Sequence, residues 1–95
     1  MYRIISGRGT GKTSRLMLLA KENDAIIVCR HPEHMREKAH AYGITGLKLM
    51  SYYDFLVAKA NEKIVGSYLI DEMEDFVKAY FSKQGSLIGY SLTEE

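Results

Sequence analysis

A glycine-rich stretch near the start of the chain, residues 6–13 (SGRGTGKT), combines three glycines with a lysine and two threonines. Glycines at this spacing allow positive φ angles, so that successive backbone N–H groups can converge on one anion. A helix that begins at the lysine adds a favourable field for negative charge. In this chemistry Lys12 would stabilise the β- and γ-phosphates of a nucleotide, and the Thr13 hydroxyl would ligate Mg²⁺. The alternative is a flexible turn with an incidental lysine.

The phosphate-loop pattern is Gly, four residues of any type, Gly, Lys, then Ser or Thr. Gly11, Lys12 and Thr13 match the end of this pattern, but Ser6 occupies its first position, where a side chain has to be accommodated. Apolar residues before the loop predict a strand and those after it predict a helix, which is the context that phosphate binding requires. We expect nucleotide contacts from Ser6, Gly7, Arg8, Gly9, Thr10, Gly11, Lys12, Thr13 and Ser14.

A second stretch, residues 67–76 (SYLIDEMEDF), supplies the carboxylates that a magnesium nucleotide site needs. Asp71 and Glu72 follow an apolar run that predicts a strand. Ligands of parallel α/β sheets lie at the carboxyl ends of the strands, so Asp71 is expected at the same edge as the glycine-rich loop. There Asp71 would hold Mg²⁺, directly or through water, and Glu72 would polarise the attacking water as a general base. The alternative is two solvated acids at a helix start, where they favour the helix dipole.

These two motifs resemble those of a large protein class. Residues 6–13 look like a Walker A motif, and residues 68–72 look like a Walker B motif with the adjacent catalytic glutamate. Together they are similar to the P-loop NTPases that carry this glutamate and an additional strand between the two motif strands. The resemblance implies a RecA-like core, with the additional strand at residues 87–92 and a polar sensor at Ser91 or Thr93.

Two groups within that class compete. The stretch DEMEDF resembles the signature of superfamily 1 helicases, with Glu74 where that family has glutamine, and LMSYYDFL resembles their strand-to-helix junction. By contrast, SGRGTGKT resembles the Walker A motif of viral terminases, which implies Arg8 as an arginine finger in cis; the alternative for Arg8 is a solvated loop cation. Both groups carry further domains for which 95 residues leave no room. We therefore expect a minimal nucleotide-binding domain over residues 1–95, completed by a second copy or a partner.

The elements that must position these residues alternate along the chain. Short runs rich in β-branched residues predict strands, and apolar residues at helical spacing between them predict helices. This alternation predicts an α/β fold of three layers, in which helices flank a five-stranded, mostly parallel sheet. The expected strands are 2–6, 25–29, 47–50, 67–71 and 87–92, and the expected helices are 12–22, 32–42, 51–60 and one from 73 that closes at Gly85.

The composition, 46% hydrophobic and 26% charged, is ordinary for a globular domain. The single Cys29 excludes an intramolecular disulfide and fits a reducing compartment. No apolar run is long enough to cross a bilayer. We expect a cytoplasmic protein, either bacterial or viral in a host cytoplasm.

Charge is unevenly distributed, although the net charge is only +1. Residues 1–48 hold nine Lys/Arg and four Asp/Glu (net +5), whereas residues 49–95 hold four and eight (net −4). DNA or RNA contacts through Arg30, Arg36 and Lys38 are one interpretation, and a solvated helix face is the other. Tyr52 and Tyr53 either stack on bases or place one ring in the core. Cys29 and the histidines match no common zinc spacing.

The sequence as a whole predicts Mg²⁺-dependent ATP binding with slow ATP hydrolysis, in the service of a nucleic-acid process. Lys12, Glu72 and Arg8 are the expected catalytic residues, and Thr13 and Asp71 the expected metal ligands. Two alternatives stay open. One is a nucleotide-sensing binding module without turnover, and the other is a nucleic-acid-binding accessory protein with a vestigial nucleotide site.

Overall fold

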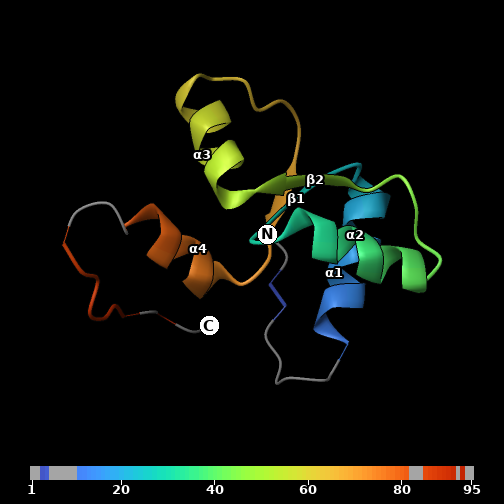
Figure 1. The fold of residues 1–95 in the computed structure, drawn as a ribbon, viewed down its shortest axis with the longest axis horizontal. Helices are drawn as coiled ribbons and strands as arrows, with labels where there is room; N and C mark the ends of the chain where they lie inside the picture. Colours follow the sequence, from blue (N-terminus) through green and yellow to red (C-terminus); the bar gives the residue numbers. More distant parts are fainter. Residues whose placement is uncertain (1–2, 5–10, 82–84, 92, 94–95) are drawn as a thin grey trace.

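The fold was analysed in a computed structural model, which describes residues 3–4, 11–81, 85–91 and 93 (Figure 1). Helices and strands alternate through this part of the chain. In order they are α1 (Lys12–Asn23), β1 (Ile26–Cys29), α2 (Pro32–Ala41), β2 (Lys48–Ser51), α3 (Tyr52–Ala60), β3 (Tyr68–Ile70) and α4 (Met73–Tyr80).

The described strands form one parallel sheet in the order β2-β1-β3. The central strand, β1, pairs on both sides, and Val28 lies opposite Met50 of β2 and Ile70 of β3. Its run of β-branched residues suits this position, because a central parallel strand is covered on both faces. The parallel arrangement brings the carboxyl ends of all three strands to one edge of the sheet.

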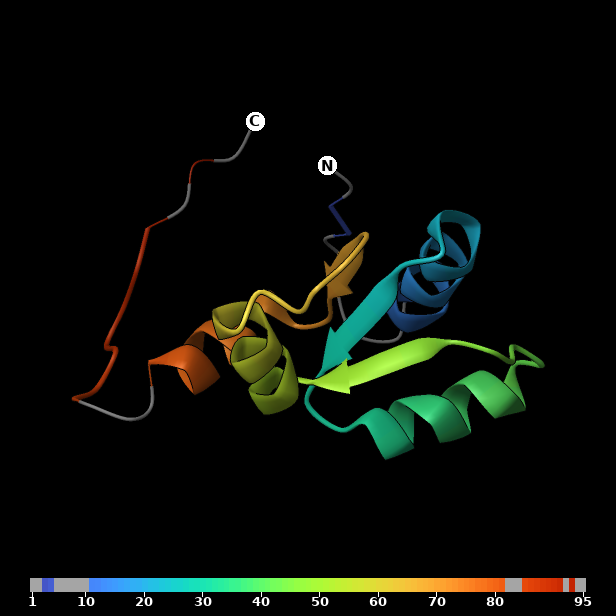
Figure 2. The ribbon, with the colours of Figure 1, turned by 90° about the horizontal axis from the view of Figure 1, so that it is seen from above.

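Helices cover both faces of this sheet, with α1 and α2 on one side and α3 and α4 on the other (Figures 1 and 2). Alternate residues of β1 point to opposite faces, so Ile27 and Cys29 pack with the first pair of helices and Val28 with the second. The first core cluster consists of Leu16, Met17, Ala20, Ile27, Cys29, Met35, Ala39 and Leu47, and the second of Val28, Tyr52 and Phe55.

Local signals mark the start of α3 and both ends of α2 where the sequence predicts them. The Ser51 side chain caps α3 by accepting a hydrogen bond from the Asp54 backbone N–H at 3.1 Å. Pro32 occupies the first turn of α2. Gly43 follows that helix with a φ of 73°, and the Ile44 N–H donates to the Ala39 carbonyl at 2.8 Å, which satisfies a carbonyl at the helix end.

The prediction of a five-stranded RecA-like core is wrong for the described residues, whose sheet has three strands. Residues 86–91 form no strand. They include 87–91, the described part of the last expected strand. Their side chains find no sheet face to cover: Ile88 is 98% exposed, and Gly89 interrupts the run. Arg3 and Ile4 of the first expected strand are likewise outside any strand, and the rest of that segment lies outside the described residues.

Two helices pack less completely than their sequences predict. The apolar run of α1 suggests packing on several sides, but α1 buries a single stripe, Leu16, Met17 and Ala20, and leaves Leu18 exposed. The strongly amphipathic α4 has no buried residue and ends at Tyr80, before Gly85.

Candidate functional site

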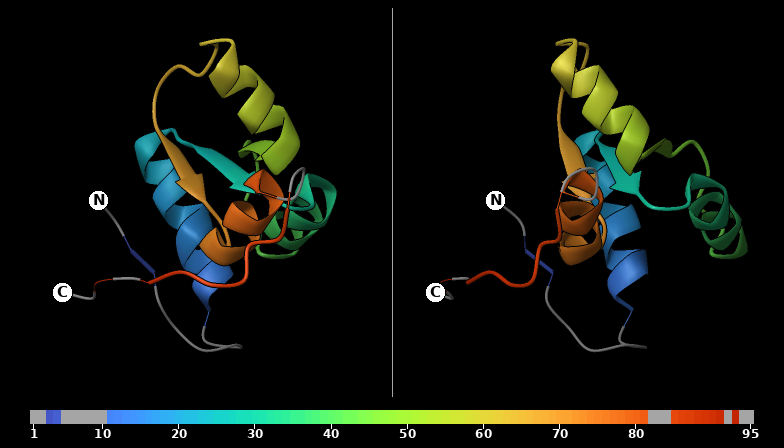
Figure 3. Two further views of the ribbon diagram at one scale, coloured as in Figure 1. Left: turned by 90° about the vertical axis from the view of Figure 1, so that its left-hand side faces the viewer. Right: turned by 60° about the vertical axis from the view of Figure 1, so that its left-hand side comes forward.

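The carboxyl edge of the sheet brings the start of α1 beside the residues that follow β3. Figure 3 shows the end of β3 and the beginning of α4 next to the first turns of α1. Here the Lys12 ammonium donates to the Glu72 carboxylate, with Nζ and Oε1 2.7 Å apart. These two residues are 60 positions apart in the chain. The structure thus joins the two motifs that sequence analysis treated as parts of one site.

Gly11, the described end of the glycine-rich loop, has a left-handed backbone conformation. Gly11 is the N-cap of α1 and has a φ of 78°, in the left-handed region that favours glycine. Thr13 is half-buried in the first turn of the helix. The Ser14 hydroxyl donates to the Gly11 carbonyl at 3.0 Å, so this side chain is turned back onto its own helix. The remaining expected contacts, Ser6, Gly7, Arg8, Gly9 and Thr10, lie outside the described residues.

Glu72 adopts an unusual backbone conformation between β3 and α4. Its φ and ψ are 57° and 71°. This left-handed region is energetically unfavourable for any residue that has a side chain. The Tyr52 hydroxyl donates to the Asp71 carbonyl at 2.7 Å and lies 3.3 Å from the Glu72 carbonyl. Strained residues of this kind gather at functional sites when their surroundings hold them in place.

Asp71 is half-buried beside this turn, and its electrostatics suit a cation. Burial raises the pKa of the Asp71 carboxyl above its ordinary value, because desolvation disfavours the charged form. The neighbouring Glu72 charge raises this pKa further, while Lys12 and Lys38 lower it. A divalent cation would offset both the desolvation and the repulsion. Asp71 and Thr13 carry oxygen atoms of the kind that Mg²⁺ prefers as ligands.

Cys29 and Tyr52 are buried at this carboxyl edge of the sheet. Burial, with a smaller contribution from the Asp71 charge, raises the pKa of the Cys29 thiol to about 11, so this cysteine is protonated at neutral pH. Burial and, to a smaller extent, the Asp71 charge also raise the pKa of the Tyr52 hydroxyl, which therefore stays a hydrogen-bond donor.

The predicted nucleic-acid contacts lie at the start and on the surface of α2. Arg36 and Lys38 are exposed. Arg30 is also exposed, and its guanidinium lies 3.9 Å from the Asp75 carboxylate. The predicted sensor residues Ser91 and Thr93 are exposed and belong to no strand, so no sheet register places them at the site.

Sequence reasoning missed the role of Tyr52 at this edge. The interpretation that one tyrosine of the pair packs in the core is confirmed, because Tyr52 is buried and Tyr53 is exposed. The contact between Tyr52 and the 71–72 backbone was not foreseen. Its signal was the position of Tyr52, directly after the Ser51 cap and thus at the carboxyl end of β2.

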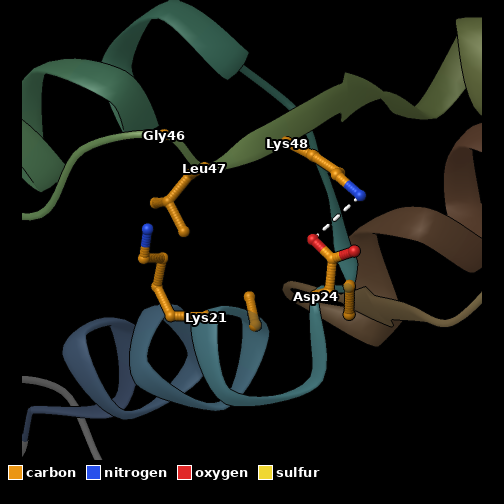
Figure 4. Close-up of a pocket in the computed structure, with 7 residues that line it drawn as sticks. Lys21, Asp24, Gly46, Leu47 and Lys48 are labelled. Carbon is orange, nitrogen blue, oxygen red and sulfur yellow. Dashed lines mark ion pairs between the residues drawn. The ribbon is translucent and has the colours of Figure 1, made fainter.

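Two surface hollows among the described residues lie away from this site. The smaller, about 50 Å³, is at the amino edge of the sheet, where Lys48 pairs with Asp24 at 2.9 Å (Figure 4). Beside it, Lys21 donates to the Thr45 carbonyl at 2.8 Å. The larger, about 210 Å³, lies between α2 and residues 44–47. Within the described ranges, no group of three or more His, Cys, Asp or Glu side chains could hold a metal ion.

Comparison with known proteins found no matching family model, no matching curated protein and no matching solved structure. No helix among the described residues is long and apolar enough to span a membrane.

Proposed function

We propose that the chain is a minimal Mg²⁺-dependent ATP-binding protein that hydrolyses ATP slowly. The observation that carries this proposal is the 2.7 Å contact between Lys12, at the start of α1, and Glu72, beside Asp71 at the carboxyl edge of a parallel sheet. This edge is where α/β proteins bind ligands, and a helix start beside it favours an anion.

Each residue has a role that follows from its position. The Lys12 ammonium stabilises phosphate charge, and the Gly11 turn brings the backbone of the loop close to the phosphates. Asp71 and Thr13 hold the magnesium ion, which supplies charge neutralisation on the phosphates when it is bound. One or two protein oxygens are enough for this ion, because Mg²⁺ keeps water and phosphate ligands. Arg8 is proposed as a further contact to the γ-phosphate.

The Lys12–Glu72 ion pair adds a link between binding and chemistry. A phosphate oxygen that accepts from the Lys12 ammonium competes with the Glu72 carboxylate for this position, because the two negative groups repel each other. When the phosphate binds Lys12, the Glu72 carboxylate is released and can act as a general base toward water. This competition keeps the base paired until the substrate is in place.

The proposal is tested by measuring ATP binding with and without Mg²⁺, together with phosphate release by the purified protein. We expect binding that requires Mg²⁺ and a low rate of phosphate release. Binding without release would support the nucleotide-sensing alternative. Absence of binding by a folded, monodisperse protein would refute the proposal.

A nucleic-acid process is the second part of the proposal, supported by the exposed Arg36 and Lys38 on α2. Phosphate contacts of this kind weaken steeply with salt. If the nucleotide site is vestigial, Lys12→Ala will retain DNA binding, whereas neutralising Arg36 and Lys38 will abolish it. We assign this activity to the cytoplasm, because the one cysteine is a buried, unbridged thiol.

A further inference from the structure

Tyr52 is held in one orientation by the elements around it. It is the first residue of α3, directly after the Ser51 cap, and it is 5% exposed. Its ring packs edge-on against Phe76 of α4, with the two centroids 5.3 Å apart. The ring is therefore fixed between α3 and α4, and the hydroxyl has a fixed direction toward the turn after β3.

The hydroxyl reaches the backbone of the two acidic residues of the proposed site. It donates to the Asp71 carbonyl at 2.7 Å and lies 3.3 Å from the Glu72 carbonyl. Both carbonyls flank the left-handed backbone of Glu72, whose φ is 57°. This region is unfavourable for a residue with a side chain, so its surroundings have to hold it. The Tyr52 hydroxyl supplies one hydrogen bond that does so, beside those from the Asp71 N–H to the Val28 carbonyl at 2.9 Å and from the Phe76 N–H to the Glu72 carbonyl at 3.0 Å.

The backbone angle of Glu72 decides where its side chain points. In the observed conformation the carboxylate meets the Lys12 ammonium at 2.7 Å. A change of φ to the negative region would rotate the side chain about the backbone and move the carboxylate away from α1. The Tyr52 hydroxyl is thus connected to Lys12 through the 71–72 backbone and the Glu72 side chain.

We infer that Tyr52 is a positioning residue for the general base: its hydroxyl holds the Asp71–Glu72 turn so that the Glu72 carboxylate lies at the start of α1. The catalytic consequence of this inference rests on the proposed function. The effect of Tyr52 on the backbone of Glu72 does not depend on that function.

The structural part is tested by NMR on Tyr52→Phe, which removes the hydroxyl and keeps the ring. The one-bond coupling between Cα and Hα of Glu72 distinguishes positive from negative φ. We expect Glu72 to lose its positive φ in Tyr52→Phe and to retain it in the control Tyr42→Phe, which removes the hydroxyl of an exposed tyrosine at the end of α2. A positive φ retained at Glu72 in Tyr52→Phe would overturn the inference.

The catalytic part is tested by steady-state ATP hydrolysis. We expect Tyr52→Phe to lower kcat about 100-fold, the lower end of what a positioned general base contributes. KM for Mg·ATP should stay the same or fall up to about fivefold, because the Glu72 carboxylate no longer pairs with Lys12. In the Glu72→Gln background the same substitution should leave Mg·ATP affinity unchanged, since Tyr52 acts through Glu72 and turnover is already at background. A further loss of affinity in the double variant would contradict this, because a merely structural weakening would act independently of Glu72.

A variant that restores a donor completes the test. Replacing Tyr52 with 4-aminophenylalanine keeps an N–H donor at the ring position of the hydroxyl, so we expect it to restore both the positive φ of Glu72 and turnover. This variant also decides the matter if Tyr52→Phe does not fold, because a folded donor variant without a positive φ at Glu72 overturns the inference. If the wild type hydrolyses no ATP, the proposed function fails, whereas the NMR comparison still decides whether Tyr52 positions Glu72.

Discussion

The substitution Glu72→Gln removes both roles that we propose for Glu72, and two assays read them separately. In the structure its carboxylate accepts from Lys12 at 2.7 Å, and in the proposed mechanism it activates water. The amide of glutamine keeps the size of the side chain but loses its charge and its basicity. The substitution therefore releases Lys12 and removes the base at the same time.

The exposure of the two side chains sets the magnitude. Lys12 is 29% exposed and Glu72 is 49% exposed, so solvent screens their attraction. An ion pair of this kind contributes about 0.2–1 kcal/mol to stability, and its loss should lower the free energy of unfolding by no more than that. In Glu72→Gln, phosphate binding at Lys12 no longer has to break this ion pair, so the same free energy is gained in binding. Mg·ATP should then bind up to about fivefold more tightly, since 1.4 kcal/mol corresponds to a tenfold change.

Two assays check this prediction. Calorimetric titration with Mg·ATP should show equal or tighter binding in Glu72→Gln, and phosphate release should fall to background. Glu74→Gln is the matched control, because it removes the same charge from an exposed residue of α4. The gain in affinity should shrink as salt is added. Hydrolysis at the wild-type rate would remove Glu72 from the mechanism, and weaker binding than in Glu74→Gln would refute the competition for Lys12.

Three further predictions concern the backbone, the charge and the thiol at this edge. Gly11→Ala and Gly43→Ala place a side chain at φ values of 78° and 73°, so thermal unfolding should show a free energy of unfolding about 1–2 kcal/mol lower in each variant. Only Gly11→Ala should also weaken Mg·ATP binding. Because the pKa of Asp71 is raised in the folded protein, its contribution to the free energy of unfolding is most favourable at low pH and is lost as the pH rises through its titration. Urea unfolding should show this decline in the wild type and not in Asp71→Asn. A contribution of Asp71 that instead rises with pH would contradict burial as the cause of the raised pKa. Cys29, with a pKa of about 11 and 2% exposure, should react with a thiol reagent at pH 8 only as fast as the fold opens, and a rate equal to that of the unfolded protein would disprove its burial.

The sequence was informative where a local signal and the tertiary environment agree. β1 is a short run of β-branched residues and is the buried central strand, and the Ser51 cap marks the start of α3. The positive φ of Gly11 and the adjacency of Lys12 to the residues after β3 also follow from the motifs. These features depend on a few neighbouring residues, or on the rule that parallel strands end at one edge.

Features that depend on pairing partners could not be predicted from the sequence in the same way. Residues 87–91 have the composition of a strand, but a strand exists only where another strand accepts its hydrogen bonds and a core covers its side chains. Ile88 has no such cover. The hydrogen bond from Tyr52 to the Asp71 carbonyl joins residues 19 positions apart and leaves no periodic pattern.

The most direct test of the central claim is calorimetric titration of Mg·ATP into the wild type, into Lys12→Ala and into the control Lys63→Ala, which removes an exposed lysine after α3. The account predicts that the wild type and Lys63→Ala bind Mg·ATP with the same affinity, and that folded Lys12→Ala does not bind it. Equal binding in all three proteins, or none in any of them, would contradict the assignment of Lys12 and Glu72 to a nucleotide site.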